Sequence, residues 1–310
     1  MKELVSIVIP TYNRSHLIKE TLDSVIAQTY QKWECIIVDD NSTDHTETVV
    51  QRYCKTDSRF RFYKKPKNLL QGPSAARNYG FTKSKGTYIN WFDSDDIMHR
   101  EKLETDLKHI QSGEYDFTIS QSQFFSETGK PTKKYWNEKL WSDDPINDFI
   151  QLKIGWGVNA SLWKKSSLIR SKLYFNECIL TADDYLYHLQ ALELQLKPII
   201  INKTLSSLRV HPQRLNEYKL KSPSKLIVNL YLIKKRNQLG LNESSLNFLN
   251  HQYKNQFLNL LKNKKIKVAS VYLFKSLKYP YFNRLKMELV KYFCIGSVYK
   301  ILGYGYKFLK

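Results

Sequence analysis

A short apolar run, LVSIVIP at residues 4–10, decides how the chain begins to fold. The run is too short for a helix and rich in β-branched residues, which is typical of a buried strand, and Pro10 ends it because proline lacks the N–H that a sheet ladder needs. Apolar residues then recur at helical spacing after Ser15, which we expect to cap that helix. The same alternation predicts further strands at 33–38, 59–63 and 87–92 with helices between them. Such alternation predicts parallel strands joined by right-handed crossovers.

Polar side chains follow three of these strands at their carboxyl ends. They are Thr11, Tyr12 and Asn13 after the first strand, Asp39, Asp40 and Asn41 after the second, and Asp93, Ser94, Asp95 and Asp96 after the strand at 87–92. In open α/β sheets, ligands bind beyond the carboxyl ends of the strands. We therefore expect the three groups to meet on one rim and to form a binding site.

The acidic group at 93–96 has two readings. Three carboxylates this close raise one another's pKa unless a cation neutralises them, and oxygen ligands suit Mg²⁺ or Mn²⁺. Alternatively, acidic residues at a helix N-terminus complement the helix dipole. The position at a strand end beside two other polar strand ends favours a divalent metal, which Mg²⁺-type sites hold with one or two carboxylates plus substrate phosphates.

Four stretches together resemble the motifs of family 2 glycosyltransferases: VSIVIPTYNR at 5–14, IIVDDNSTD at 36–44, GPSAARNYG at 72–80, and FDSDD at 92–96, which is similar to the metal-binding DXD motif. Their order and spacing make the signal specific over about residues 4–112. The resemblance implies an α/β fold of the GT-A type, Rossmann-like with a mainly parallel central sheet flanked by helices. It also implies a nucleotide-sugar donor, UDP in particular, and an inverting, metal-dependent hexosyl or hexosaminyl transfer in bacterial surface polysaccharide biosynthesis.

The resemblance assigns roles to single residues. The residues that would contact the nucleotide-sugar are Pro10, Thr11, Tyr12, Asn13, Asp39, Arg77, Asn78, Asp93 and Ser94. Asp95 is the expected metal ligand, with Asp93 on the metal or the ribose. Without the resemblance, Asp39 and Asp40 read as a capped turn and Arg77 as part of a solvated helix face. The expected cofactor is Mn²⁺ or Mg²⁺.

A second acidic pair lies in LTADDYL at 180–186, with Thr181 as the expected helix cap. It resembles the family's Glu-Asp pair that supplies the catalytic base, with Asp183 in place of the usual Glu. An inverting transfer needs one carboxylate to deprotonate the acceptor hydroxyl. We predict Asp184 as that base and keep Asp183 as the alternative.

The segment SLRVHP at 207–212 resembles the family's Tyr-Arg-x-His segment, which makes His211 a candidate metal ligand. A lone His before proline is as often a surface residue. Trp156 has two readings as well, a platform for a sugar ring or a packed core residue.

The net charge of +20 is unevenly distributed. Residues 213–310 hold 20 Lys+Arg and only 3 Asp+Glu, so the body before them is nearly neutral. We predict a catalytic domain at 1–215, with a nucleotide-binding half at 1–112 and an acceptor half at 113–215, and a basic helical C-terminal extension at 216–310.

The basic region suggests a polyanionic partner. Lys286, Lys291 and Lys300 alternate there with Tyr292, Phe293, Tyr299, Ile301 and Leu302, which suits a helix lying on an anionic membrane surface near a lipid-linked acceptor. A solvated helical face that covers the core is the alternative.

Two other functions stay open at this point, a nucleotide-sugar-binding module without activity and a nucleic-acid-binding protein that uses the basic region. Nucleic acid is the partner that we do not expect, because it leaves the acidic strand ends unexplained. Four dispersed cysteines argue against a zinc finger or a disulfide scaffold, and no secretory signal or membrane span is apparent. We expect a cytoplasmic protein, peripheral on the inner face of the cell membrane.

Overall fold

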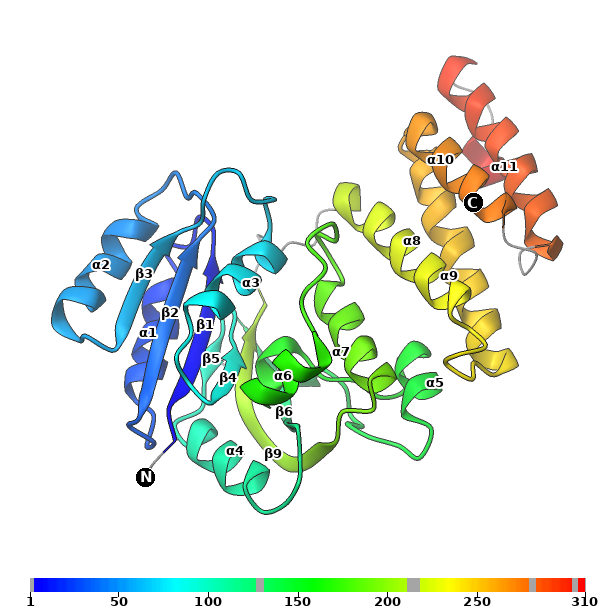
Figure 1. The fold of residues 1–310 in the computed structure, drawn as a ribbon. Helices are drawn as coiled ribbons and strands as arrows, with labels where there is room; N and C mark the ends of the chain where they lie inside the picture. The colour runs from blue at the N-terminus through cyan, green and yellow to red at the C-terminus, as the bar shows by residue number, and fades with distance from the viewer. Residues whose placement is uncertain (1–2, 127–130, 211–217, 279–282, 303–305, 310) are drawn as a thin grey trace. The chain divides into compact units, whose positions relative to one another are not determined.

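The computed structural model describes residues 3–126, 131–210, 218–278, 283–302 and 306–309. It divides the chain into two compact units. Unit 1 holds residues 1–145 and 153–214, and unit 2 holds residues 146–152 and 215–310. Figure 1 shows the strands in unit 1 and a group of helices in unit 2. The predicted boundary at 215/216 stays a prediction, but the short segment 146–152 groups with the C-terminal helices.

One sheet runs through unit 1, in the order β3-β2-β1-β4-β8-β6-β9-β5, with β7 paired to β6. Its strands are β1 Val5–Thr11, β2 Trp33–Asp39, β3 Phe60–Lys64, β4 Tyr88–Trp91, β5 Ile97–Met98, β6 Phe117–Phe125, β7 Pro131–Tyr135, β8 Leu162–Lys164 and β9 Pro198–Arg209. The pairs that join β3, β2, β1 and β4 are all parallel, as the sequence predicts. The other half is mixed, because β8 runs antiparallel to β4 and β6 while β9 runs parallel to β6.

Helices cover both faces of the parallel half. They are α1 Ile18–Ile26, α2 Thr46–Thr56, α3 Pro73–Lys83 and α4 Lys102–Ile110, and the rest of the unit adds α6 Lys165–Ser171, α7 Asp183–Glu193 and the short turn η1 Val158–Ala160. Alternate residues of β1, such as Ile7 and Ile9, share one core with Leu22 of α1 and Leu107 of α4. The residue between them, Val8, faces Gly80 of α3 on the other side. This alternation follows from the two-residue period of a strand.

Unit 2 is helical. It contains most of α5 Pro145–Ile150, then α8 Tyr218–Lys234, α9 Glu243–Lys262, α10 Ile266–Leu277, α11 Asn283–Leu302 and the short turn η3 Tyr306–Leu309. Asn242 caps α9 by accepting a hydrogen bond from the Ser245 N–H. In the part of the chain that the structure describes, every helix is too short or too polar to span a membrane.

Two predicted helix caps were wrong. Leu17 precedes α1 and its side chain makes no capping bond, while the Ser15 N–H donates to Asp44 at 3.0 Å. Ala182 precedes α7, and the buried Thr181 hydroxyl has no hydrogen-bond partner among the described residues. α1 begins three residues after Ser15 and α7 begins two residues after Thr181, so neither hydroxyl is at the N-cap position.

Candidate active site

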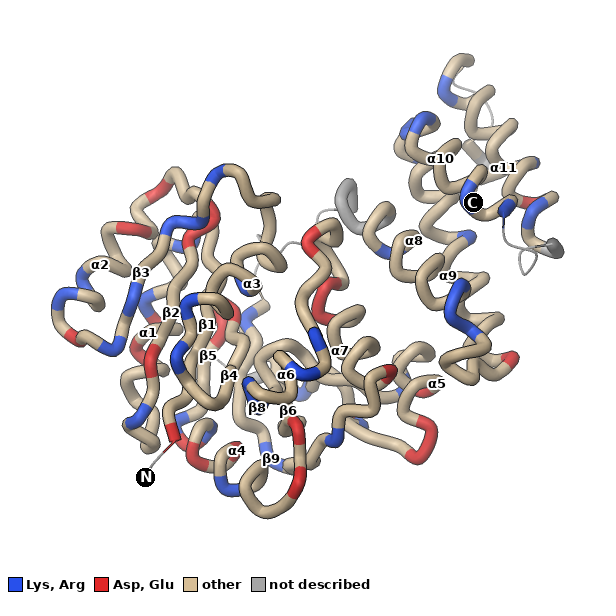
Figure 2. The backbone as a smooth tube through the Cα atoms, in the orientation of Figure 1, with Lys and Arg blue, Asp and Glu red and all other residues tan. Residues whose placement is uncertain are grey.

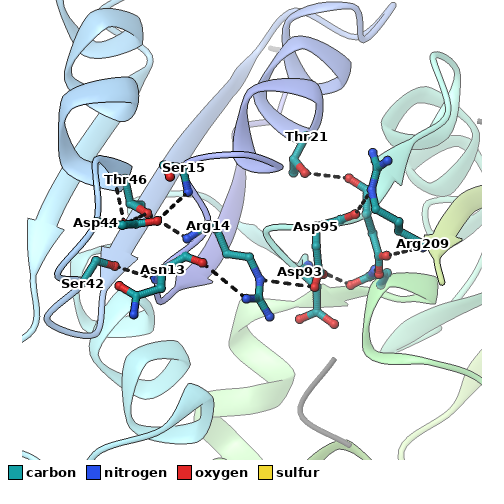
Figure 3. Close-up of polar contacts among 12 residues, drawn as sticks. Asn13, Arg14, Ser15, Thr21, Ser42, Asp44, Thr46, Asp93, Asp95 and Arg209 are labelled. Carbon is teal, nitrogen blue, oxygen red and sulfur yellow. Dashed lines mark hydrogen bonds and ion pairs between the residues drawn. The ribbon is translucent and has the colours of Figure 1, made fainter. Parts of the chain in front are cut away.

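The ends of β1, β2 and β4 lie side by side, and their loops are linked by hydrogen bonds (Figure 3). Asn13, in a left-handed conformation with φ of 51°, donates from its N–H to the Ser42 hydroxyl at 2.9 Å. Its side-chain oxygen accepts from the Thr43 N–H at 2.8 Å. Asparagine tolerates this conformation better than most residues because its side chain bonds locally. The predicted nucleotide-contacting loop after β1 is therefore held rigidly against the loop after β2.

Asp44 fixes the same two loops from the other side. It accepts hydrogen bonds from the N–H groups of Ser15 and Thr46 at 3.0 Å each. Burial alone would raise the pKa of this carboxyl, but the bonds from Thr46 and Ser15 lower it to about 2. Asp44 is thus ionised at any physiological pH and acts as a fixed acceptor.

The two acids after β2 have different surroundings. The carboxylate of Asp39 accepts hydrogen bonds from within its own loop, from the Ser42 N–H at 3.0 Å and from the Ser42 hydroxyl. Asp40 pairs with the buried Lys65 at 2.5 Å and accepts from the Gly72 N–H at 2.6 Å. Asp40 therefore ties the loop after β3 to the start of α3, which matches its interpretation as a structural turn residue.

The acidic group after β4 converges as predicted. Asp93, Asp95 and Asp96 offer carboxylate oxygens that all lie within 4.8 Å of one another. Asp96 is buried, and both of its oxygens are engaged, one by the Asn159 amide at 2.6 Å and one by the Arg209 N–H at 2.8 Å. Asp93 and Asp95 are more exposed, at 34% and 13% of their side chains. A hard divalent cation held by two carboxylates, with phosphates completing its shell, fits this donor set.

Arg77 joins the two acidic motifs. Its guanidinium is buried and contacts Asp93 at 2.6 Å and Asp183 at 2.7 Å through different nitrogens, and it lies over the ring of Phe175 at 5.0 Å. The Ser74 hydroxyl also donates to Asp183 at 3.1 Å. Arg77 is therefore no solvated helix residue: it brings the start of α7 to the end of β4.

Asp184 differs from its neighbour. It is half-buried and accepts a hydrogen bond from the Tyr185 N–H at 2.8 Å. Burial, and then the like charge of Asp183, raise the pKa of Asp184 to about 7, against the opposing effect of Arg77. Asp183 is held by a guanidinium and Asp184 has a pKa near neutrality, so their surroundings separate the two carboxyls as an acid–base pair requires.

The other predicted residues lie around this centre. Pro10, Thr11 and Ser94 are buried and Tyr12 is 44% exposed. Asn78 uses its side chain to hold a loop, donating to the Phe175 carbonyl and to Glu177 at 2.9 Å each. The metal-ligand prediction for His211 lies outside the described residues. Trp156 is a core residue, 2% exposed, whose indole N–H donates to His188 at 3.1 Å.

Sequence reasoning gave no role to two arginines at the site. Arg14 approaches Asp95 at 3.4 Å, and Arg209 donates to the Asp95 carbonyl at 3.0 Å while pairing with Glu20 at 2.7 Å. Both arginines lie inside motifs that the sequence already singled out. The need to balance the charge of the clustered carboxylates was the signal that could have identified them. Clustered carboxylates need cations nearby, and these are the basic residues of those motifs besides Arg77.

A cavity of about 560 Å³ lies elsewhere in unit 1, over the middle of β6 and β9. Its lining includes Gln121, Tyr135, Trp141 and Asn202. The predicted site residues that the structure describes are not among its lining. It is therefore separate from the acidic centre.

Known proteins are similar to this chain in sequence and in fold. The family model described as glycosyl transferase family 2 matches residues 6–170, which is more than half of the chain. A protein named TuaG, for a teichuronic acid biosynthesis glycosyltransferase, from Bacillus subtilis (strain 168) is 34% identical over 151 residues, 48% of this chain and 59% of that protein. The Campylobacter jejuni protein named GalNAc(5)-diNAcBac-PP-undecaprenol beta-1,3-glucosyltransferase is 30% identical over 187 residues, 58% of this chain and 59% of that protein.

Among solved structures, S. aureus TarS 1-349 in complex with UDP-GlcNAc superposes with a TM-score of 0.67 at 18% identity, covering 96% of this chain and 92% of that one. This likeness shows the GT-A fold. The alignments with the first curated relatives span 18% to 59% of those proteins' lengths.

Proposed function

Because this chain belongs to glycosyl transferase family 2, we propose that it moves a sugar from a UDP-sugar to a hydroxyl of a glycan or lipid-linked acceptor, inverting the anomeric carbon. One observation carries the proposal. Arg77 joins the DXD-like motif to the second acidic pair, so that the carboxylates proposed to bind the donor lie near a carboxyl with a pKa of about 7. A binding module without activity needs no such second carboxyl.

In the proposed reaction, Asp184 accepts the proton of the acceptor hydroxyl as its oxygen attacks the anomeric carbon. The bond between that carbon and the diphosphate oxygen breaks, and the nucleoside diphosphate leaves with the electron pair. A base whose pKa lies near the working pH is the most effective in such a step. Asp183, paired with Arg77, acts as a positioning residue that also raises the pKa of Asp184.

On the donor side, we propose that Asp95 and Asp93 hold Mn²⁺ or Mg²⁺, with His211 as a further ligand. When bound, such an ion stabilises negative charge on the departing diphosphate. Pro10, Thr11, Tyr12, Asn13 and Asp39 would line the nucleoside pocket, and the hydrogen-bonded loops of Asn13 and Ser42 support this because they are fixed in place. Ser94, Arg77 and Asn78 would lie beside the diphosphate and sugar.

The relatives suggest the setting. The B. subtilis protein is named for teichuronic acid biosynthesis and the C. jejuni protein for an undecaprenol-linked glycan. We therefore propose a role in surface polysaccharide biosynthesis at the inner face of the cell membrane. The absence of a nucleic-acid partner stays a prediction.

The test measures sugar transfer and donor hydrolysis with UDP-, GDP- and dTDP-sugars in the presence of Mn²⁺. Wild type should turn over a UDP-sugar. Asp184→Asn should bind the donor with unchanged affinity and lose roughly 10²- to 10⁴-fold in turnover, the usual contribution of a general base. Asp183→Asn serves as the matched control and should keep more activity. Equal turnover of Asp184→Asn and wild type would move the base to another residue, and tight donor binding without turnover by wild type would favour a binding module.

A further inference from the structure

The exposed side of α11 carries an apolar stripe, and Lys291 lies on the same side of the helix. Its exposed residues are Met287, Val290, Cys294, Val298, Ile301 and Leu302, spaced by three or four positions, which places them on one side of a helix. Met287 is 82% exposed and Ile301 is 79% exposed. Isolated exposed apolar residues are ordinary, but a contiguous row along a whole helix marks an interaction surface.

The opposite side of α11 is already occupied. Leu285 and Leu289 are buried, and Gly296 lies so close to α9 that a Cβ there would come within 2.8 Å of the Leu261 side chain. Tyr292 and Phe293, which the sequence suggested as membrane-facing, are half-buried. Of the residues that the sequence suggested, Ile301 and Leu302 are exposed on the stripe, whereas these two aromatic residues are only partly accessible.

The neighbouring helix of unit 2 has a similar exposed side. On α10, which packs against α11, Val271 and Phe274 are exposed on the same side as Lys267, Lys275 and Lys278. These positions again repeat at three and four residues. We call the two exposed helix sides together the α10–α11 face.

The charge around this face is positive. Lys291 is exposed on the same side of α11 as the stripe, and Lys300 is exposed on another side of the helix. Between residues 266 and 302 the sequence contains a single acidic residue, Glu288, and Lys254 of α9 neutralises it at 2.5 Å. Figure 2 shows the basic residues along the helices of unit 2 and the scarcity of acidic ones.

We propose that the α10–α11 face binds the surface of an anionic lipid bilayer, with the aliphatic stripe in the interface and the lysines at the headgroups. An amphipathic helix with Lys on its polar flank buries its apolar side about 5–10 Å into such an interface. Each Lys near an anionic surface adds attraction that salt weakens. A second copy of the chain is the less suitable occupant, because two faces with the same positive charge repel each other.

The inference deepens the proposed function by assigning the residues that would bring the enzyme to a lipid-linked acceptor. Its test does not depend on transfer. The exposed thiols Cys294, within the stripe, and Cys178, in unit 1, allow a polarity-sensitive dye to be placed on and off the face of the full chain. Cys54 is changed to Ser in both proteins and the unused exposed cysteine is also changed to Ser.

With vesicles of phosphatidylglycerol and phosphatidylcholine, the dye at Cys294 should shift to shorter wavelength and the dye at Cys178 should not. Pure phosphatidylcholine vesicles and high salt should each weaken the shift. No shift at Cys294 with anionic vesicles overturns the proposal. A shift without vesicles that grows with protein concentration, accompanied by a larger mass in light scattering, would instead identify a second copy as the occupant.

Paired variants exclude an effect of the label. Met287→Asp with Ile301→Asp should reduce co-sedimentation with anionic vesicles at least tenfold. The control pair, Ile169→Asp with Leu194→Asp, places two acids at exposed apolar positions of unit 1. This pair should change co-sedimentation with anionic vesicles little. Transfer to a soluble acceptor should survive the first pair, so loss of vesicle binding with intact turnover separates this inference from the proposed reaction. Equal co-sedimentation of both pairs contradicts it.

Discussion

At the scale of single residues, neighbouring carboxyls of the same motif have different tasks. Asp96 accepts hydrogen bonds from Asn159 and Arg209 inside the protein, whereas the more exposed Asp95 meets the Arg14 side chain at 3.4 Å. Asp183 is neutralised by Arg77, whereas Asp184 has its pKa raised to about 7. We therefore propose that one acid of each pair, Asp96 and Asp183, is structural and that the other, Asp95 and Asp184, takes part in the reaction.

The first pair gives a direct prediction. Asp95→Asn should abolish metal-dependent UDP binding in calorimetry and leave the thermal unfolding temperature almost unchanged. Asp96→Asn should lower the free energy of unfolding by about 1–3 kcal/mol, because its new amide would face donors from Asn159 and Arg209 inside the protein. If Asp96→Asn were as stable as wild type and Asp95→Asn were not, the two roles would be reversed.

The second pair predicts a pH dependence. Turnover should rise with pH through about 7 and level off above it, because Asp184 accepts a proton only when ionised. Asp183→Asn removes the like charge and should move this rise to lower pH in a pH–rate profile. A rise that stays in place in Asp183→Asn would assign the titration to a different group.

The same pKa shift predicts the direction of a stability change. The folded-state pKa of Asp184 lies above its ordinary value of 3.8, so between these values the folded protein binds more protons than the unfolded chain. Stability contributed by this group therefore falls as pH rises from about 4 to 7. The measurement is the unfolding temperature of Asp184→Asn minus that of wild type. This difference should be larger at pH 8 than at pH 4, because only wild type loses the contribution of Asp184 as pH rises. An equal difference at both pH values would contradict the raised pKa.

At the scale of elements, the site depends on how closely α3 approaches the sheet. Gly80 lies over β1 and β2, where an added Cβ would come within 2.4 Å of a Val8 methyl and 3.1 Å of a Val38 methyl. That approach lets Arg77, one turn earlier on α3, reach the end of β4. The glycine is therefore a condition for the contact between the two acidic motifs.

Gly80→Val should lower the free energy of unfolding by about 1–3 kcal/mol through overpacking and should also reduce turnover, since α3 has to move away from the sheet. Chemical denaturation and steady-state kinetics measure the two effects. Gly240→Ala is a useful contrast, because at Gly240 the cost comes from its φ of 60° and nothing lies within 4 Å of an added Cβ. It should destabilise without affecting turnover at saturating donor. Wild-type stability of Gly80→Val would contradict the close approach.

At the scale of the whole molecule, the two units are not two consecutive stretches of the sequence. Residues 146–152 belong to unit 2 although residues 153–214, which follow them, belong to unit 1. Asn147 makes the connection: its amide donates to the Gly240 carbonyl at 3.2 Å, and its oxygen accepts from the Asn242 N–H at 3.0 Å. The cap residue of α9 is thus anchored to α5.

Asn147→Ala should lower the free energy of unfolding of unit 2 by about 1–3 kcal/mol, since it removes two hydrogen bonds made by a buried side-chain amide. Hydrogen exchange should show faster exchange in α9 than in α3. Lys153→Ala, at an exposed neighbouring position, should leave both rates unchanged. Uniform acceleration across both units would indicate that they unfold as one.

The sequence by itself determined the parallel half of the sheet and the identity of the acidic motifs. These depend on local patterns, the short β-branched runs of β1 and β2 and the polar residues directly after them, whose placement follows from the strand ends. Only the tertiary structure decided which partner each acid contacts, because the partners are distant in sequence: Arg77 meets Asp183, and Asp96 meets Arg209. The same holds for α11, where Gly296 packs against Leu261 and the aliphatic stripe is exposed. Burial and charge act through space, and no spacing along the chain encodes them.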